Sequence, residues 1–160
     1  MSSGRLLNIS EAASLALHAC LRLAGAQEGY LSAKRIAQEL GVSEHHLTKV
    51  LNRLVRLGIV SSSRGAAGGF SLARRPGELS LLEIYEAVEG PLREEHCLLS
   101  RPVCVNRRCL FGSLIAEVHR KVKSYLAHTT VKDVLLWQQR TPEGGRAKRK
   151  KKTGKRSGRE

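Results

Sequence analysis

The most informative stretch of the chain is residues 32–73, with the sequence SAKRIAQELGVSEHHLTKVLNRLVRLGIVSSSRGAAGGFSLA. Ser32 and Ser43 each precede an apolar pattern of helical period, as helix N-caps do, and Gly41 separates the two patterns. The apolar positions are Ile36, Ala37 and Leu40 in the first helix, then Leu47, Val50, Leu51, Leu54 and Leu57 in the second. Two short β-prone runs around the glycine-rich turn 64–69 predict a hairpin. Helix, turn, helix and hairpin in this order predict a winged helix-turn-helix.

The second of these helices has a polar face that suits the major groove of DNA. Its outward positions are His45, His46, Thr48, Lys49, Asn52, Arg53 and Arg56, with no acid after Glu44. In such helices the N-terminal residues contact base edges, a role that we predict for His45, His46 and Lys49. Arg53 and Arg56 are predicted to contact phosphates. Taken alone, this face is equally typical of an ordinary solvated helix.

The predicted hairpin adds an independent argument for DNA. Arg64 lies beside glycines that allow a close approach of the backbone to a surface, and a single arginine on a narrow tip suits a minor groove. A nucleotide-binding phosphate loop is disfavoured, because the turn lacks the Lys-Ser/Thr pair and opens no helix. The residues predicted to contact double-stranded DNA are therefore Ser43, His45, His46, Lys49, Arg53, Arg64 and Gly65.

The remaining sequence predicts a mainly α-helical fold with one small hairpin. A buried helix is expected from Ser10 to Ala24, and a Ser80-capped helix ends at Gly90. We expect four segments: a winged helix-turn-helix domain over residues 1–90, a cysteine-bearing loop over 91–109, a dimerisation helix with a closing segment over 110–140, and a disordered basic tail over 141–160.

A long helix expected from about Leu110 to Ala127 points to a homodimer. Its apolar positions, Leu110, Leu114, Ile115, Val118, Val122, Tyr125 and Leu126, lie on one stripe. A protruding helix with such a stripe needs a partner to cover it. The alternative is that the stripe packs against its own domain. A second copy of the chain is favoured.

Charge supports a polyanionic partner. The 160-residue chain has a net charge of +14, of which the tail contributes half through nine Lys or Arg and two acids. Because the body is basic on its own, the prediction of nucleic-acid binding does not depend on the tail. No stretch approaches the roughly 20 apolar residues of a membrane span, and acidic and basic residues interrupt the only candidate export signal. We expect a cytoplasmic protein without a membrane partner.

Three cysteines form a candidate metal or redox site. Cys97, Cys104 and Cys109 are spaced C-x6-C-x4-C between two predicted helices, and clustered thiolates can bind a soft metal centre. An iron–sulfur cluster, zinc and a metal-free thiol sensor all fit this spacing. Cys20 lies on the apolar first helix and is expected to be an inert buried thiol. The sequence shows no catalytic constellation, so neither an enzyme nor a small-molecule substrate is expected.

Residues 42–60, the RGxxGG turn and Thr129–Leu135 together resemble the Rrf-two family of bacterial transcription regulators, over about Leu6 to Trp137. The resemblance implies a homodimer crossed by its long helices. It also implies a [2Fe-2S] or [4Fe-4S] cluster on the three cysteines, although the middle cysteine is shifted by one residue from C-x5-C-x5-C. A fourth ligand is then required, and Gly112 stands where some members have histidine. The candidates are Glu11 or His18 of the other subunit, and the nearby His96 and His119.

The sequence therefore predicts a DNA-binding transcription regulator, with repression as the expected effect, gated by an iron–sulfur cluster or by thiol redox state. The alternative is a winged-helix adaptor that contacts protein, RNA or membrane without sequence-specific DNA binding. The acid-free helix face and Arg64 favour DNA.

Overall fold

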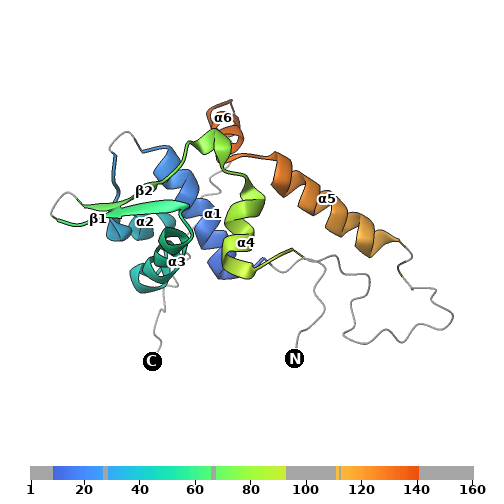
Figure 1. The fold of residues 1–160 in the computed structure, drawn as a ribbon, viewed down its shortest axis with the longest axis horizontal. Helices are drawn as coiled ribbons and strands as arrows, with labels where there is room; N and C mark the ends of the chain where they lie inside the picture. Colours follow the sequence, from blue (N-terminus) through green and yellow to red (C-terminus); the bar gives the residue numbers. More distant parts are fainter. Residues whose placement is uncertain (1–8, 27–28, 66–67, 93–110, 112, 141–160) are drawn as a thin grey trace, which may run out of the picture.

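The computed structural model describes residues 9–26, 29–65, 68–92, 111 and 113–140 of the chain (Figure 1). Within them the elements are α1 (Glu11–Ala24), α2 (Ala33–Leu40), α3 (Glu44–Arg56), β1 (Val60–Ser63), β2 (Gly69–Leu72), the short 3-10 turn η1 (Pro76–Glu78), α4 (Leu81–Glu89), α5 (Leu114–His128) and α6 (Val131–Arg140). The fold is mostly helical with one two-stranded sheet, as predicted.

Serine N-caps define the starts of four helices. The hydroxyls of Ser10, Ser32, Ser43 and Ser80 each accept a hydrogen bond from the backbone N–H three residues further on, at 3.1–3.4 Å. These bonds satisfy amide groups that have no partner inside the helix. Gly41 ends α2 in the left-handed region, at φ 68°. The predicted starts of these four helices are therefore confirmed.

The core lies around α1, which packs against α3, α4 and α6. The buried residues of α3 are Leu47, Val50, Leu51 and Leu54. Leu57 was expected among them, and that prediction was wrong, because its side chain is 54% exposed. The helix ends at Arg56, and the turn at Leu57 and Gly58 breaks the periodicity. Ile59 enters the core in its place.

The hairpin pairs β1 with β2 in antiparallel register, from Val60 opposite Leu72 to Ser63 opposite Gly69. Leu31 extends this sheet through a bridge to Phe70, with reciprocal backbone hydrogen bonds of 2.9 and 2.8 Å. The segment before α2 is therefore joined to the hairpin, which we call the wing. This register places the turn that contains Arg64 at the tip of the wing.

The closing segment returns the chain to the start of α4. The Leu81 N–H donates to Thr129 and the Val131 N–H donates to Leu79, at 2.9 and 3.0 Å. Asp133 accepts hydrogen bonds from the Thr130 hydroxyl and N–H, which lower the pKa of this carboxyl. These contacts set α6 against the body, whereas α5 extends away from it (Figure 1). No helix in the described ranges is both long and apolar enough to cross a bilayer.

Candidate nucleic-acid interface

The recognition surface that the sequence predicts on α3 is largely open to solvent. His45, Lys49, Arg53 and Arg56 are exposed, and His46 is half-buried. Ser43 is at the N-cap, where its hydroxyl accepts a hydrogen bond from the His46 N–H at 3.4 Å. Figure 1 shows α3 and the wing on the same side of the body, away from α5. The structure thus places α3 and the wing, the two elements that carry the predicted residues, on the same side of the body.

His46 faces a second group besides solvent. Its Nδ1 lies 3.8 Å from Oε1 of Glu11, in the first turn of α1. The two side chains are partly exposed, so the contact is weak. A charged His46 would nevertheless be drawn toward α1 and away from a base edge. The sequence contains no signal for this contact, because the two residues are 35 positions apart in different helices.

The glycines of the wing have distinct structural roles. Gly65, next to the exposed Arg64, has φ 106° in open space. A Cβ at Gly68 would lie 2.4 Å from the Ser63 carbonyl oxygen, and one at Gly69 would lie 2.4 Å from that of Leu31. Two of the glycines are therefore required by close backbone packing, and Gly65 by its backbone conformation.

Arg53 has a contact within the protein. Its Nε donates a hydrogen bond of 2.7 Å to the backbone carbonyl of Ala87 on α4. One edge of the guanidinium is thus engaged, while the side chain as a whole stays exposed. This contact had no signal in the sequence, because a backbone acceptor can belong to any residue.

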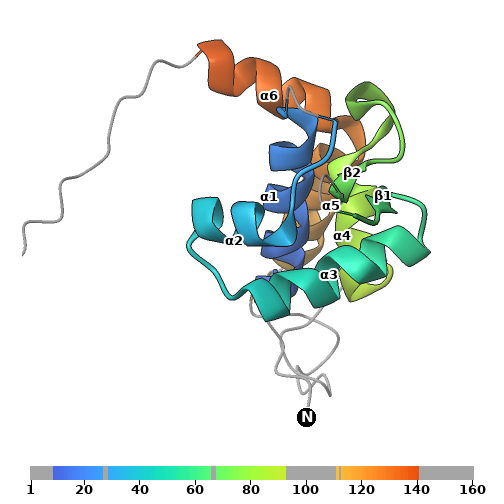
Figure 2. The same ribbon diagram turned by 90° about the vertical axis from the view of Figure 1, so that its left-hand side faces the viewer.

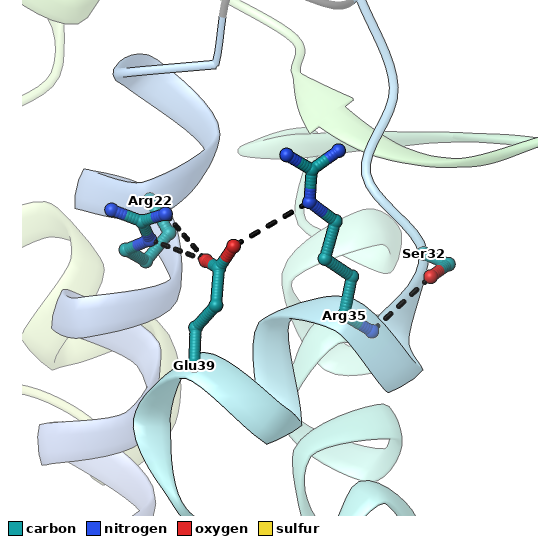
Figure 3. Close-up of polar contacts among 4 residues, drawn as sticks. All are labelled: Arg22, Ser32, Arg35 and Glu39. Atoms are coloured by element: carbon teal, nitrogen blue, oxygen red, sulfur yellow. Dashed lines mark hydrogen bonds and ion pairs between the residues drawn. The ribbon is translucent and has the colours of Figure 1, made fainter.

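An acidic residue on the neighbouring helix α2 is neutralised. Figure 3 shows the Glu39 carboxylate between two arginines. Arg22 of α1 donates to it from Nε at 2.8 Å and also from Nη2, and Arg35 donates from Nε at 3.4 Å. Exposed ion pairs such as these contribute little to stability. Their electrostatic effect is to reduce the repulsion that an unpaired carboxylate would exert on a nearby phosphate.

The metal-ligand predictions fall mostly outside the described residues. Cys97, Cys104, Cys109 and His96 lie there, as does the basic tail. The ranges that the structure describes contain no group of three or more potential ligands. Cys20 is fully buried, and burial raises the pKa of its thiol to about 12. The expected burial of this thiol is confirmed.

The remaining candidates for a fourth ligand differ in their surroundings. The side chain of Glu11 is 74% exposed. Nδ1 of His18 lies 2.7 Å from the Ser14 carbonyl oxygen, which can only accept, so Nδ1 is the donor in this contact. His119 is 6% exposed, and neither of its ring nitrogens has a hydrogen-bond partner within the described structure.

The apolar stripe on α5 is divided between two environments. Ile115 is buried within its own chain, and Leu126 packs against the core of the same chain. Leu114 and Tyr125, in contrast, are 52% and 53% exposed, and Val118 and Val122 are half-buried. Their helical spacing predicted a single stripe that faces the partner. Only part of it is available to a second copy.

Comparison with known proteins identifies the group of proteins that shares this architecture. The model of the Rrf2 family, described as an iron-dependent transcriptional regulator, matches residues 9–136. The chain belongs to the Rrf2 family. It is 31% identical to the regulator NsrR of Shouchella clausii, over 66% of this chain and 72% of that protein. Identity to the regulator CymR of Bacillus subtilis is 32%, over 67% of this chain and 73% of that protein.

Solved structures of Rrf2 proteins share the fold. The structure of B. subtilis CymR superimposes with a TM-score of 0.69 at 30% identity, over 82% of this chain and 98% of that one. T. potens IscR gives a TM-score of 0.66 at 28% identity, over 86% and 94%. The chain is therefore a DNA-binding transcription regulator of the Rrf2 type and not an enzyme, as the sequence predicts.

Proposed function

We propose that two copies of this Rrf2 protein bind an operator in cytoplasmic DNA, and that Cys97, Cys104 and Cys109 control this binding. The observation that carries the proposal is that α3 and the wing lie on the same side of the body and that their basic residues are exposed. Lys49, His45 and His46 are assigned to base edges, with Ser43 at the start of the helix. Arg53 and Arg56 are assigned to phosphates, and Arg64 with Gly65 to the minor groove.

The DNA contacts are tested with duplexes that the chain itself selects from a random pool. Arg64→Ala is expected to weaken binding to the selected duplex by about 1–3 kcal/mol, as removal of a sequence- or shape-reading side chain does. Lys49→Ala is expected to act at one operator position if it contacts a base, and on all duplexes equally if it contacts phosphate. Lys123→Ala, exposed on α5, is the control.

If both variants bound the operator as tightly as the unmodified chain, the assignment of α3 and the wing to the DNA interface would be wrong. The same titrations against RNA over a salt series separate a DNA regulator from an adaptor that uses its charge for another partner. Preference for RNA at every salt concentration would contradict the proposal.

The finer proposal is that the three cysteines bind an iron–sulfur cluster. The donor set supports it, since three clustered thiolates are the ligands that such clusters use. Among the candidates for a fourth ligand, His18 is favoured over Glu11. Metal-binding histidines usually donate their other N–H to a carbonyl or carboxylate, and His18 already does so to Ser14. The cluster would supply sensitivity to oxygen or nitric oxide.

Anaerobic purification followed by absorbance and iron analysis tests this proposal. The protein is expected to be brown, and alanine at any one of the three cysteines is expected to bleach it, whereas Cys20→Ala leaves it coloured. His18→Ala is expected to alter the spectrum. His128→Ala is a matched control, because Nδ1 of His128 makes the same 2.7 Å contact with the Ser124 carbonyl on another helix.

Two other results would show that the three cysteines form a different kind of site. Colourless, metal-free protein that still responds to oxidant through these cysteines would establish a thiol sensor, in which disulfides form between them. Stoichiometric zinc would make the cysteine segment a structural metal site.

A further inference from the structure

The last turn of α4 is contacted from two other helices. Arg53 of α3 donates its Nε–H to the carbonyl of Ala87 at 2.7 Å. Ser10, the N-cap of α1, donates its hydroxyl to the carboxylate of Glu89. The turn therefore connects the recognition helix with the start of the first helix.

The contact with Arg53 satisfies a backbone group that needs an external partner. The last four carbonyls of an α-helix have no N–H inside the helix to accept from, and Ala87 is one of these in α4. A cationic donor at a helix C-terminus is also favoured by the helix dipole. The Arg53 guanidinium and the Ala87 carbonyl are therefore well matched, and their hydrogen bond holds α3 against the C-terminal end of α4.

The same turn is bonded to the chain that leaves it. Gly90 ends α4 at φ 84°, and the backbone N–H of Leu92 donates 2.9 Å to the Glu86 carboxylate. Five residues after Leu92 the sequence reaches Cys97. The chain that leads to Cys97 is therefore bonded, at Leu92, to the same turn that accepts from Arg53.

We propose that Arg53 is a positioning residue that couples the cysteine segment to the recognition helix. The inference rests on the proposed function. Arg53 lies one turn after Lys49 on the same rigid helix, so a shift of the α4 turn passes through Arg53 to the base-contacting residues. The planar guanidinium suits both tasks, because its Nε faces Ala87 while its other nitrogens remain for a phosphate.

Two substitutions distinguish the effect of the Arg53–Ala87 hydrogen bond from the effect of the positive charge of Arg53. Arg53→Met removes both the charge and the donor. Arg53→Gln removes the charge but leaves an amide N–H at the same chain length as Nε, where it can donate to Ala87. Arg56→Met is the matched control, because it removes one charge from an exposed position of the same helix. The side chains of Arg53 and Arg56 are exposed, so the variants are expected to fold.

Each variant is combined with a background in which Cys97, Cys104 and Cys109 are all alanine, which removes a cluster and disulfides alike. In the unmodified chain we expect this background to change affinity for the selected duplex by about fivefold or more. With Arg53→Met the change is expected to fall below about twofold, whereas Arg53→Gln and Arg56→Met are expected to keep it. Salt dependence is expected to fall similarly in all three, because each removes one cation.

The inference would be overturned if replacing the three cysteines changed duplex affinity as much in Arg53→Met as in the unmodified chain. It would also be overturned if this change in affinity were lost in both Arg53→Met and Arg53→Gln. An unmodified chain that binds duplex with no dependence on the cysteines would also overturn it, with the DNA-binding proposal intact. Failure of the unmodified chain to bind duplex would refute the proposed function instead. Amide hydrogen exchange of α3 tests the coupling without DNA, since the alanine background should alter exchange there unless Arg53 is Met.

Discussion

At the scale of single residues, the wing requires glycine at a position where the backbone leaves no room for a Cβ atom. A Cβ at Gly69 would lie 2.4 Å from the carbonyl oxygen and 2.6 Å from the carbonyl carbon of Leu31, both backbone atoms that pair with Phe70. Gly69→Ala is therefore expected to lower the free energy of unfolding by more than about 1 kcal/mol. Gly29→Ala is the control, because its added Cβ would lie more than 4 Å from every described residue other than its neighbours in the chain. Equal urea midpoints for the two variants would contradict this account.

Residue-level prediction from the sequence succeeded where the signal is local. The caps predicted at Ser32, Ser43 and Ser80 are confirmed, because a cap and the amide that it accepts from are three positions apart. The Arg53–Ala87 bond and the Glu11–His46 contact could not be predicted, because each joins residues distant in sequence. Ala87 accepts through its backbone, so its side chain gives no indication of the bond.

At the scale of helices, periodicity predicted the elements well and their ends less well. The period of α3 extends to Leu57, but the chain turns there and exposes that side chain. On α5, periodicity placed Ile115 and Leu114 on one stripe, although the first is buried within its own chain and the second is exposed. Neighbouring positions on a helix can face different partners, and periodicity alone does not distinguish a partner in the same chain from one in another.

The open part of the α5 stripe leads to a prediction about assembly. Leu114→Asp with Val122→Asp is expected to dissociate the proposed dimer, because carboxylates there would be desolvated against apolar groups. Asp at the first position of a helix is favourable, so the substitution at Leu114 is expected to leave α5 intact. Lys121→Asp with Lys123→Asp, exposed off the stripe, is the control. Sedimentation is expected to give one 17.6 kDa chain for the first pair and a dimer for the second.

At the scale of the whole molecule, Figure 2 shows why the elements form one unit. Helix α1 lies in the centre of the body, with α2 and α3 beside it and α4 and α5 behind, and α6 crosses one end. The sequence predicted the order of these elements and the hairpin. It did not predict that Thr129–Val131 would pair with Leu79–Leu81 to join the end of the fold to the start of α4. Such pairing depends on backbone groups and leaves little trace in residue types.

The basic tail, residues 141–160, is expected to supply part of the electrostatic attraction to DNA. Residues 141–160 contribute half of the net charge of +14 and contain no large apolar residue. Deletion of this segment is expected to preserve the fold and the oligomeric state, because it cannot contribute to a core. It is expected to weaken nonspecific DNA binding, and the logarithmic salt slope should fall by about 0.9 for each phosphate that the tail neutralises in the full chain.

The contribution of the tail is measured by titrating random duplex at several salt concentrations with the full and shortened chains. A second chain with the tail's lysines and arginines replaced by glutamine is the matched control, since it keeps the length and removes the charge. We expect it to bind like the shortened chain, because counterion release depends on charge and not on length. Salt slopes that are equal in all three chains would show that the tail does not contact DNA and that the basic body, with +7 of its own, supplies the whole attraction.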